Sequence, residues 1–178
     1  MLTAVVMVVI NTAPSGEELP RLTAGELSFA NPHGWDIAIG DAEQPDGHRV
    51  LAHVVTFGVE PDSLCTGFGD PCEPPGEAIP PGEASIIITA WEGGTPPVPD
   101  PIQRRTYGLD AQRIIGDEPA AFRLQRLTDS AIAWWQLSPP GFPDRWIEVE
   151  ADIGGKMLEQ NSVMRDIEEM LATVEFAD

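Results

Sequence analysis

The second half of the chain has the most regular alternation of apolar and polar positions. Its apolar segments are short, and turn residues such as the Gly-Asp-Glu-Pro run at 116–119 separate them. Strands joined by short connections favour an antiparallel meander. In the last segment Trp146, Glu148 and Glu150 alternate with apolar residues, so one face should be buried and the other solvated. The pattern predicts strands at 112–115, 120–127, 132–137 and 146–151.

The final periodic segment predicts a helix. Its apolar side chains recur at intervals of three and four residues, which gathers them on one face of a helix. The opposite face is charged, and Asn161 or Ser162 is expected to cap the first turn. We expect this amphipathic helix to pack on the sheet and close a single core. The apolar positions are Val163, Met164, Ile167, Met170, Leu171 and Val174.

The first half is less regular. Residues 26–30 and 35–39 predict two strands, and the Asn-Pro-His-Gly turn at 31–34 predicts that they pair as a hairpin. Residues 49–59 predict a central strand, because both of its faces are largely apolar. The β-branched run at 85–91 is the strongest strand signal and should also be central. Long segments rich in proline and glycine follow each of these two strands, and we expect irregular excursions there.

Together these elements predict an α+β fold, in which an antiparallel β-sheet packs against helices that include the C-terminal amphipathic helix. A chain of 178 residues fits one domain and is long enough to bury its own core. We divide it into residues 1–25, an apolar segment followed by a linker, and residues 26–178, a single α+β domain.

The apolar run at residues 2–10 allows two interpretations. It is too short to span a membrane, but it fits the apolar region of a truncated or unusual signal peptide. No lysine or arginine precedes it, and Asn11 is a poor residue three positions before a cleavage site. The alternative is an edge strand rich in valine and isoleucine.

Cysteine usage is consistent with export. Cys65 and Cys72 are the two cysteines, and a turn-rich stretch separates them. A disulfide is the simplest interpretation and would stabilise the fold by about 2.5 kcal/mol in the chain-entropy model. A zinc site would need further ligands, and two free thiols are the third option. We expect an extracellular or cell-surface location, with a cytoplasmic one as the alternative.

The net charge of −19 excludes some classes of partner. A field of this sign repels phosphate backbones and anionic lipid, so we expect no binding to nucleic acid or to a membrane surface. An acidic surface is also typical of salt-adapted proteins. The charge therefore names no partner, and the oligomeric state stays open.

Catalytic signatures are missing from the sequence. It contains no nucleophile elbow, zinc-binding helix, phosphate-binding loop or dinucleotide-binding turn. His33, His48 and His53 are the natural general bases at neutral pH, and none is paired recognisably with a serine or cysteine. His48 and His53 are an odd number of residues apart on one expected strand, which directs them to opposite faces. We expect no catalytic residue, no metal site and no cofactor.

Tryptophan is unusually frequent, with five residues against one tyrosine. Trp134 and Trp135 are adjacent, so on a strand one should face the core and the other the opposite side. Together with His53 they are our candidate ligand or interface residues. The alternatives are tryptophans that fill the space between sheet and helix, and a core histidine whose hydrogen bonds are satisfied.

Three short motifs resemble those of small secreted actinobacterial domains and PsbP-like domains. They are Phe29-Ala30-Asn31-Pro32-His33-Gly34-Trp35-Asp36-Ile37, Ile115-Gly116-Asp117-Glu118-Pro119-Ala120, and the terminal segment from Val163 to Phe176. The chain departs from the pattern at residues 45–48, where His48 stands in place of an expected tryptophan. The resemblance implies an antiparallel sheet sandwiched by helices in an exported or surface-associated protein. It transfers no catalytic residue.

The leading functional hypothesis is a non-enzymatic exported or cell-surface domain that binds a protein or a small ligand. One alternative is an enzyme with an unusual site around the histidines and tryptophans. The other is an intracellular, salt-adapted interaction domain.

Overall fold

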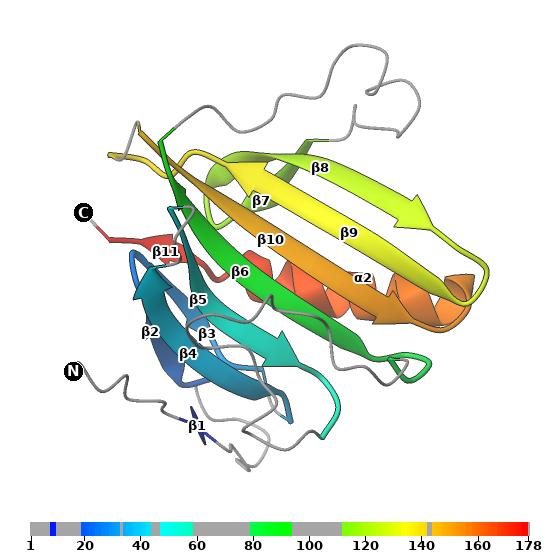
Figure 1. The fold of residues 1–178 in the computed structure, drawn as a ribbon. Helices are drawn as coiled ribbons and strands as arrows, with labels where there is room; N and C mark the ends of the chain where they lie inside the picture. The colour runs from blue at the N-terminus through cyan, green and yellow to red at the C-terminus, as the bar shows by residue number, and fades with distance from the viewer. Residues whose placement is uncertain are drawn as a thin grey trace.

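Two antiparallel sheets and one helix make up the described part of the chain (Figure 1). The computed structural model describes residues 8–9, 19–32, 34–43, 47–58, 79–93, 112–141 and 144–177. The large sheet has eight strands in the order β1 (Val8–Val9), β4 (Asp36–Glu43), β5 (His48–Val55), β6 (Ala84–Glu92), β10 (Arg145–Gly154), β9 (Ser130–Leu137), β8 (Glu118–Arg126) and β7 (Gln112–Ile115). The small sheet has three, in the order β11 (Glu175–Phe176), β3 (Leu27–Ala30) and β2 (Arg21–Ala24).

The predicted α+β fold with several helices is wrong. The described residues contain one helix, α2 (Met157–Leu171), and most of the rest is strand. Only this segment combines a helical repeat of apolar residues with sufficient length, whereas the other apolar segments alternate with period two or are short continuous runs. The small sheet, through Leu27 and Phe29, packs into the core where the prediction places further helices.

Helix α2 and the small sheet share one core with the inner face of the large sheet. In Figure 1 the helix lies behind the large sheet. The predicted apolar stripe is confirmed, because its six side chains are all buried and belong to the main core cluster. The helix begins at Met157, earlier than predicted, and the Glu159 carboxylate accepts a hydrogen bond from the Lys156 backbone N–H at 2.7 Å. The sequence pattern missed this first turn because Met157 and Leu158 are exposed.

The predicted meander of the second half is confirmed. Strands β7, β8, β9 and β10 pair in sequence order, and β10 then pairs with β6. Strand β6 is central, as its β-branched run predicts, and its other neighbour is β5. The polar and apolar alternation of β10 places Ile147, Val149 and Ala151 in the core.

The predicted hairpin of residues 26–30 with 35–39 is wrong. Strand β3 pairs with β2 and β11 in the small sheet, whereas β4 pairs with β5 and β1 in the large sheet. The turn residues were identified correctly, since Gly34 has φ +80°, but the chain uses this turn to pass from one sheet to the other. Residues 21–24, predicted as part of a linker, form β2 because the tight turn at Gly25 returns the chain onto β3.

Ion pairs connect the two sheets. The Glu26 carboxylate, which is buried in the β2–β3 turn, lies 3.1 Å from Arg49 on β5 and 3.9 Å from Arg145 on β10. Arg145 also pairs with Glu92 at 2.9 Å.

Some predictions fall outside the described residues. Cys65, Cys72 and His33 lie there, as does most of the apolar run at 2–10. Of that run, Val8 and Val9 form β1, which pairs with β4 at the edge of the large sheet.

Candidate functional site

The outer face of the large sheet, opposite α2, carries a line of acidic side chains. Glu148, Glu150 and Asp152 occupy alternate positions of β10, so they project from the same face. All three are half-buried. We call these three residues the carboxylate strip.

Polar and aromatic side chains of β9 and β8 flank the strip. Gln136 and Trp134 are the direct cross-strand partners of Glu148 and Glu150. The Gln136 side-chain amide donates to Glu148 at 2.5 Å, and the Trp134 indole N–H donates to Glu150 at 2.6 Å. On β8 the Arg123 guanidinium stacks 4.2 Å from the centre of the Trp134 ring. Two of the three carboxylates are thus held in place by neutral donors.

The surroundings of the strip raise the pKa of two of its members, Asp152 and Glu148. Burial raises the pKa of Asp152 to about 6, and the neighbouring Glu150 carboxylate adds to the effect. Burial also raises the pKa of Glu148; the hydrogen bond from Gln136 opposes this rise, and Glu150 reinforces it. Within the described residues, neither the lysine nor any arginine forms an ion pair with the strip.

An aromatic row crosses the same face beside the strip. The rings of Trp91 and Trp146 are stacked, with centroids 5.0 Å apart and an interplanar angle of 4°. The His48 ring lies 4.8 Å from that of Trp91 on the other side. Trp91 and Trp146 are direct cross-strand partners on β6 and β10. The outer face therefore places a largely buried row of aromatic rings next to the carboxylate strip.

The three candidate residues from the sequence have different positions. Trp134 is half-buried on the outer face, at the carboxylate strip. Trp135 is fully buried on the inner face and packs against Phe122 at a centroid distance of 5.2 Å. His53 is fully buried, and its Nε2 is 2.8 Å from the Ser85 hydroxyl. Of the three, Trp134 is the one that a ligand at the strip could contact.

The prediction that His48 and His53 face opposite sides of the sheet is wrong. Their partners on β6 are Trp91 and Ile87, four residues apart, so both histidines point to the outer face. A register shift between Val50 and Ala52 adds one residue to β5 and inverts the expected alternation.

The sequence pattern does not predict the carboxylate strip. It predicts a solvated face at Glu148 and Glu150 and gives no role to Asp152, whereas all three are half-buried. The signal available was the neighbouring strand, where Trp134 and Gln136 alternate in phase with the carboxylates.

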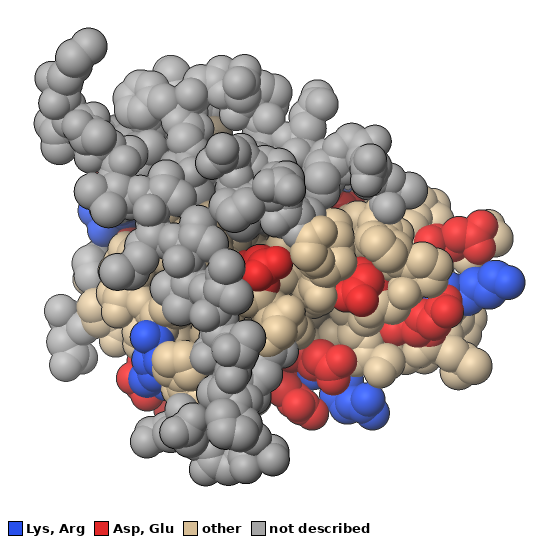
Figure 2. Space-filling model, turned by 90° about the horizontal axis from the view of Figure 1, so that it is seen from below, with Lys and Arg blue, Asp and Glu red and all other residues tan. Residues whose placement is uncertain are grey.

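The described residues contain no group of three or more histidine, cysteine, aspartate or glutamate side chains arranged to hold a metal ion. No helix in the same part of the chain is both long and apolar enough to cross a membrane. In the view from below, acidic side chains gather over a broad part of the described surface, with basic ones among them (Figure 2).

Comparison with known proteins adds little to this geometry. No family model matches the chain. No curated protein matches its sequence. One solved structure, a protein from Bacteroides thetaiotaomicron VPI-5482, is similar with a TM-score of 0.46 and 15% identity over 86% of this chain. The match spans 46% of that protein's chain. The resemblance to secreted actinobacterial and PsbP-like domains stays a prediction.

Proposed function

We propose that this protein is a non-enzymatic binding module that binds a basic segment of a partner protein on the outer face of the large sheet. The observation that carries the proposal is the carboxylate strip, which is half-buried and lacks a cationic partner among the described residues. Lysine and arginine side chains would supply that partner.

Two physical effects favour a cationic ligand. A positive charge near Asp152 and Glu148 favours their ionised forms, which burial disfavours in the free protein. Trp134 lies beside the strip and already has the Arg123 guanidinium 4.2 Å from the centre of its ring, so this part of the face accommodates a cation next to an aromatic side chain. The net charge of −19 would also steer basic partners toward the protein.

Titration with an oligolysine peptide tests the proposal. The double variant Glu150→Gln/Asp152→Asn should weaken binding about tenfold, because it removes two charges that contact the peptide. The matched control is Asp117→Asn/Asp129→Asn, which removes the same charge from exposed turns. If both double variants weaken peptide binding equally, the peptide responds only to the net charge of the protein. That result would overturn the proposed site.

The pH dependence of binding gives a second readout. Asp152 ionises as the pH rises through about 6, so the affinity for oligolysine should increase across that range. The Asp152→Asn variant should show a smaller increase, because Glu148 is then the strip carboxylate whose raised pKa remains.

An enzymatic function receives less support from the described residues. The enzyme hypothesis places a site around the histidines and tryptophans, but His53 and Trp135 are fully buried. Export also stays a proposal, supported by the apolar run at 2–10 and the cysteine pair. Mass spectrometry of the protein from its native compartment tests it, since free thiols together with an intact N-terminus would contradict export.

A further inference from the structure

A pocket opens beside the C-terminal end of α2, away from the carboxylate strip. Its volume is about 270 Å³, which suits a small organic molecule. The helix, the small sheet and the connection from β3 to β4 all contribute to its walls. The described lining residues are Leu19, Ala30, Pro32, Trp35, Asp166, Glu169, Met170 and Thr173.

The lining combines an apolar interior with a negative rim. Trp35, Met170 and Ala30 of β3 supply apolar surface, together with residues on either side of the small-sheet strands β2 and β3. Asp166 and Glu169 are exposed and lie three residues apart on α2, so they project from the same side of the helix. Among the described residues, the exposed Arg165 forms a long ion pair with this rim, its Nε lying 3.9 Å from Asp166.

The negative potential at the end of the helix is partly offset. The C-terminus of a helix carries a partial negative charge, and basic residues in the last turn usually offset it. The last turn of α2 has no basic residue, but the Arg21 guanidinium of β2 lies 2.9 Å from the Thr173 carbonyl just beyond the helix. The described lining also contains no lysine, arginine or histidine.

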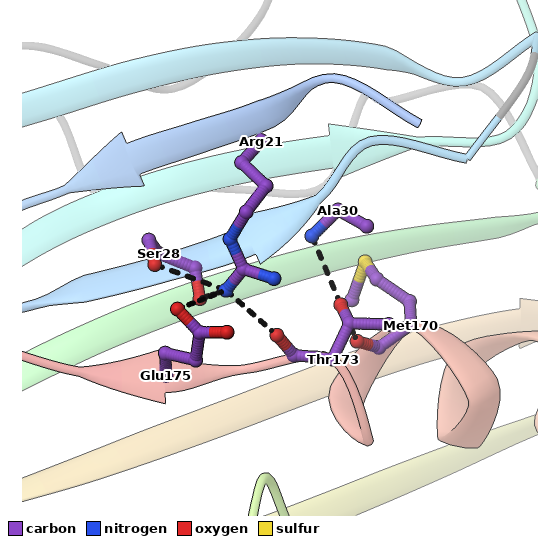
Figure 3. A network of polar contacts seen from close by, with 6 residues as sticks. All are labelled: Arg21, Ser28, Ala30, Met170, Thr173 and Glu175. Carbon is purple, nitrogen blue, oxygen red and sulfur yellow. Dashed lines mark hydrogen bonds and ion pairs between the residues drawn. The ribbon is translucent and has the colours of Figure 1, made fainter. Parts of the chain in front are cut away.

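Hydrogen bonds fix the wall formed by Ala30, Met170 and Thr173 (Figure 3). The Thr173 hydroxyl donates to the Met170 carbonyl at 2.7 Å and accepts from the Ala30 N–H at 2.9 Å. Arg21 donates to the Thr173 carbonyl at 2.9 Å. Hydrogen bonds within the chain therefore hold this wall in place, which lowers the entropic cost of binding a ligand there.

We propose that this pocket binds a small organic cation with an apolar body, of the arylalkylamine class. The apolar body contacts Trp35 and Met170, and the ammonium group lies at the rim near Asp166 and Glu169. The same rim repels carboxylates and phosphates. The site is independent of the proposed binding of basic segments on the outer face.

Three probes of the same shape test the charge preference. They are phenylbutylamine, phenylbutanol and phenylbutanoate, which are cationic, neutral and anionic near pH 7. Binding is followed by the NMR shift of the Trp35 indole N–H. We expect the amine to bind about tenfold more tightly than the alcohol, and the acid more weakly still. Equal affinities for the three probes, or no shift of Trp35 with the amine, would overturn the proposal.

Variants locate the charge effect. Asp166→Asn/Glu169→Gln should weaken amine binding about tenfold and leave alcohol binding unchanged. The control Asp117→Asn/Asp129→Asn should change amine binding less than about twofold, because those residues are exposed and screened by solvent. An equal loss in both variants would show that net charge, not the pocket, attracts the amine. Glu150→Gln/Asp152→Asn should leave the Trp35 shift intact, so failure of this site and failure of the outer-face site are distinguishable.

Discussion

Asp152 and Glu150 lie two residues apart on one face of β10, where burial and the neighbouring Glu150 carboxylate raise the pKa of Asp152. The pKa of Asp152 is about 6 in the folded protein and about 3.8 in the unfolded chain. Between these values the folded state binds the proton more strongly, so the Asp152 contribution to stability falls as the pH rises across this window and stays low above it.

The Asp152→Asn variant should therefore be more stable than the wild type near pH 7. We expect a gain of about 1 kcal/mol, less than the full pKa shift would give, because the side chain is only half-buried. Urea unfolding at several pH values measures it. The difference should shrink as the pH falls toward the unfolded pKa, and a variant that is less stable near neutrality would contradict this account of the strip.

Gln136 moderates the charge of Glu148 through one hydrogen bond. Replacing it in Gln136→Met keeps the side-chain length and removes the donor, so the pKa of Glu148 should rise further. Carboxyl carbon shifts followed by NMR against pH report the change. The control is Gln125→Met, because Gln125 is also a half-buried glutamine but lies on β8 and makes no hydrogen bond to Glu148. An equal change in the pKa of Glu148 in both variants would rule out the Gln136 hydrogen bond as the cause.

At the scale of elements, the turn between β7 and β8 contacts the end of α2. The Gly116 N–H donates to the Leu171 carbonyl at 2.8 Å, and Gly116 has φ +59°. A Cβ at this position would lie 2.2 Å from the Val174 carbonyl oxygen. Only glycine satisfies both the backbone conformation and the close approach.

Gly116→Ala should therefore destabilise the protein by about 3 kcal/mol, from a strained φ and a backbone clash together. Gly82→Ala is the matched control, because Gly82 has φ +81° and no atom within 4 Å of an added Cβ. The Gly82→Ala variant should lose about 1 kcal/mol of folding stability. Thermal or urea unfolding compares them, and similar losses would contradict the importance of the helix contact.

Local sequence patterns predicted where strands and the helix form better than they predicted which strands pair with each other. The strands β6 to β10 follow from alternation and short turns, and α2 follows from the spacing of its apolar residues. The predicted hairpin of β3 with β4 was wrong because β3 pairs with β2 and with β11, which is distant in sequence. The prediction that His48 and His53 lie on opposite faces was wrong because one extra residue in β5 inverts the alternation of side chains. Nothing in the local sequence marks such a bulge.

The candidate site was harder to predict than the elements. Trp134 was identified from its adjacency to Trp135, which assigns the two rings to opposite faces. The site at the carboxylates of β10 could not be predicted, because alternating glutamates also occur on fully solvated strands. Their significance comes from half-burial and from the lack of a described cationic partner, and both depend on how the strands assemble.

For the whole molecule, the net charge of −19 predicts a response to salt. Repulsion among the acidic side chains destabilises the folded state, and added ions screen it. Raising sodium chloride from about 0.05 M to about 1 M should therefore raise the urea midpoint. Steep loss of stability at the low end would favour the salt-adapted interpretation, and a midpoint independent of salt would contradict this role of the net charge.

The pairing of β11 with β3 also has a consequence for the order of biosynthesis. Residues 27–28 are translated early, but their partners are Glu175 and Phe176. Until residues 175 and 176 have left the ribosome, β3 keeps a free edge with unsatisfied hydrogen-bonding groups, of the kind that recruits other chains. A nascent chain of this protein should therefore depend on chaperones or rapid completion of translation to avoid aggregation.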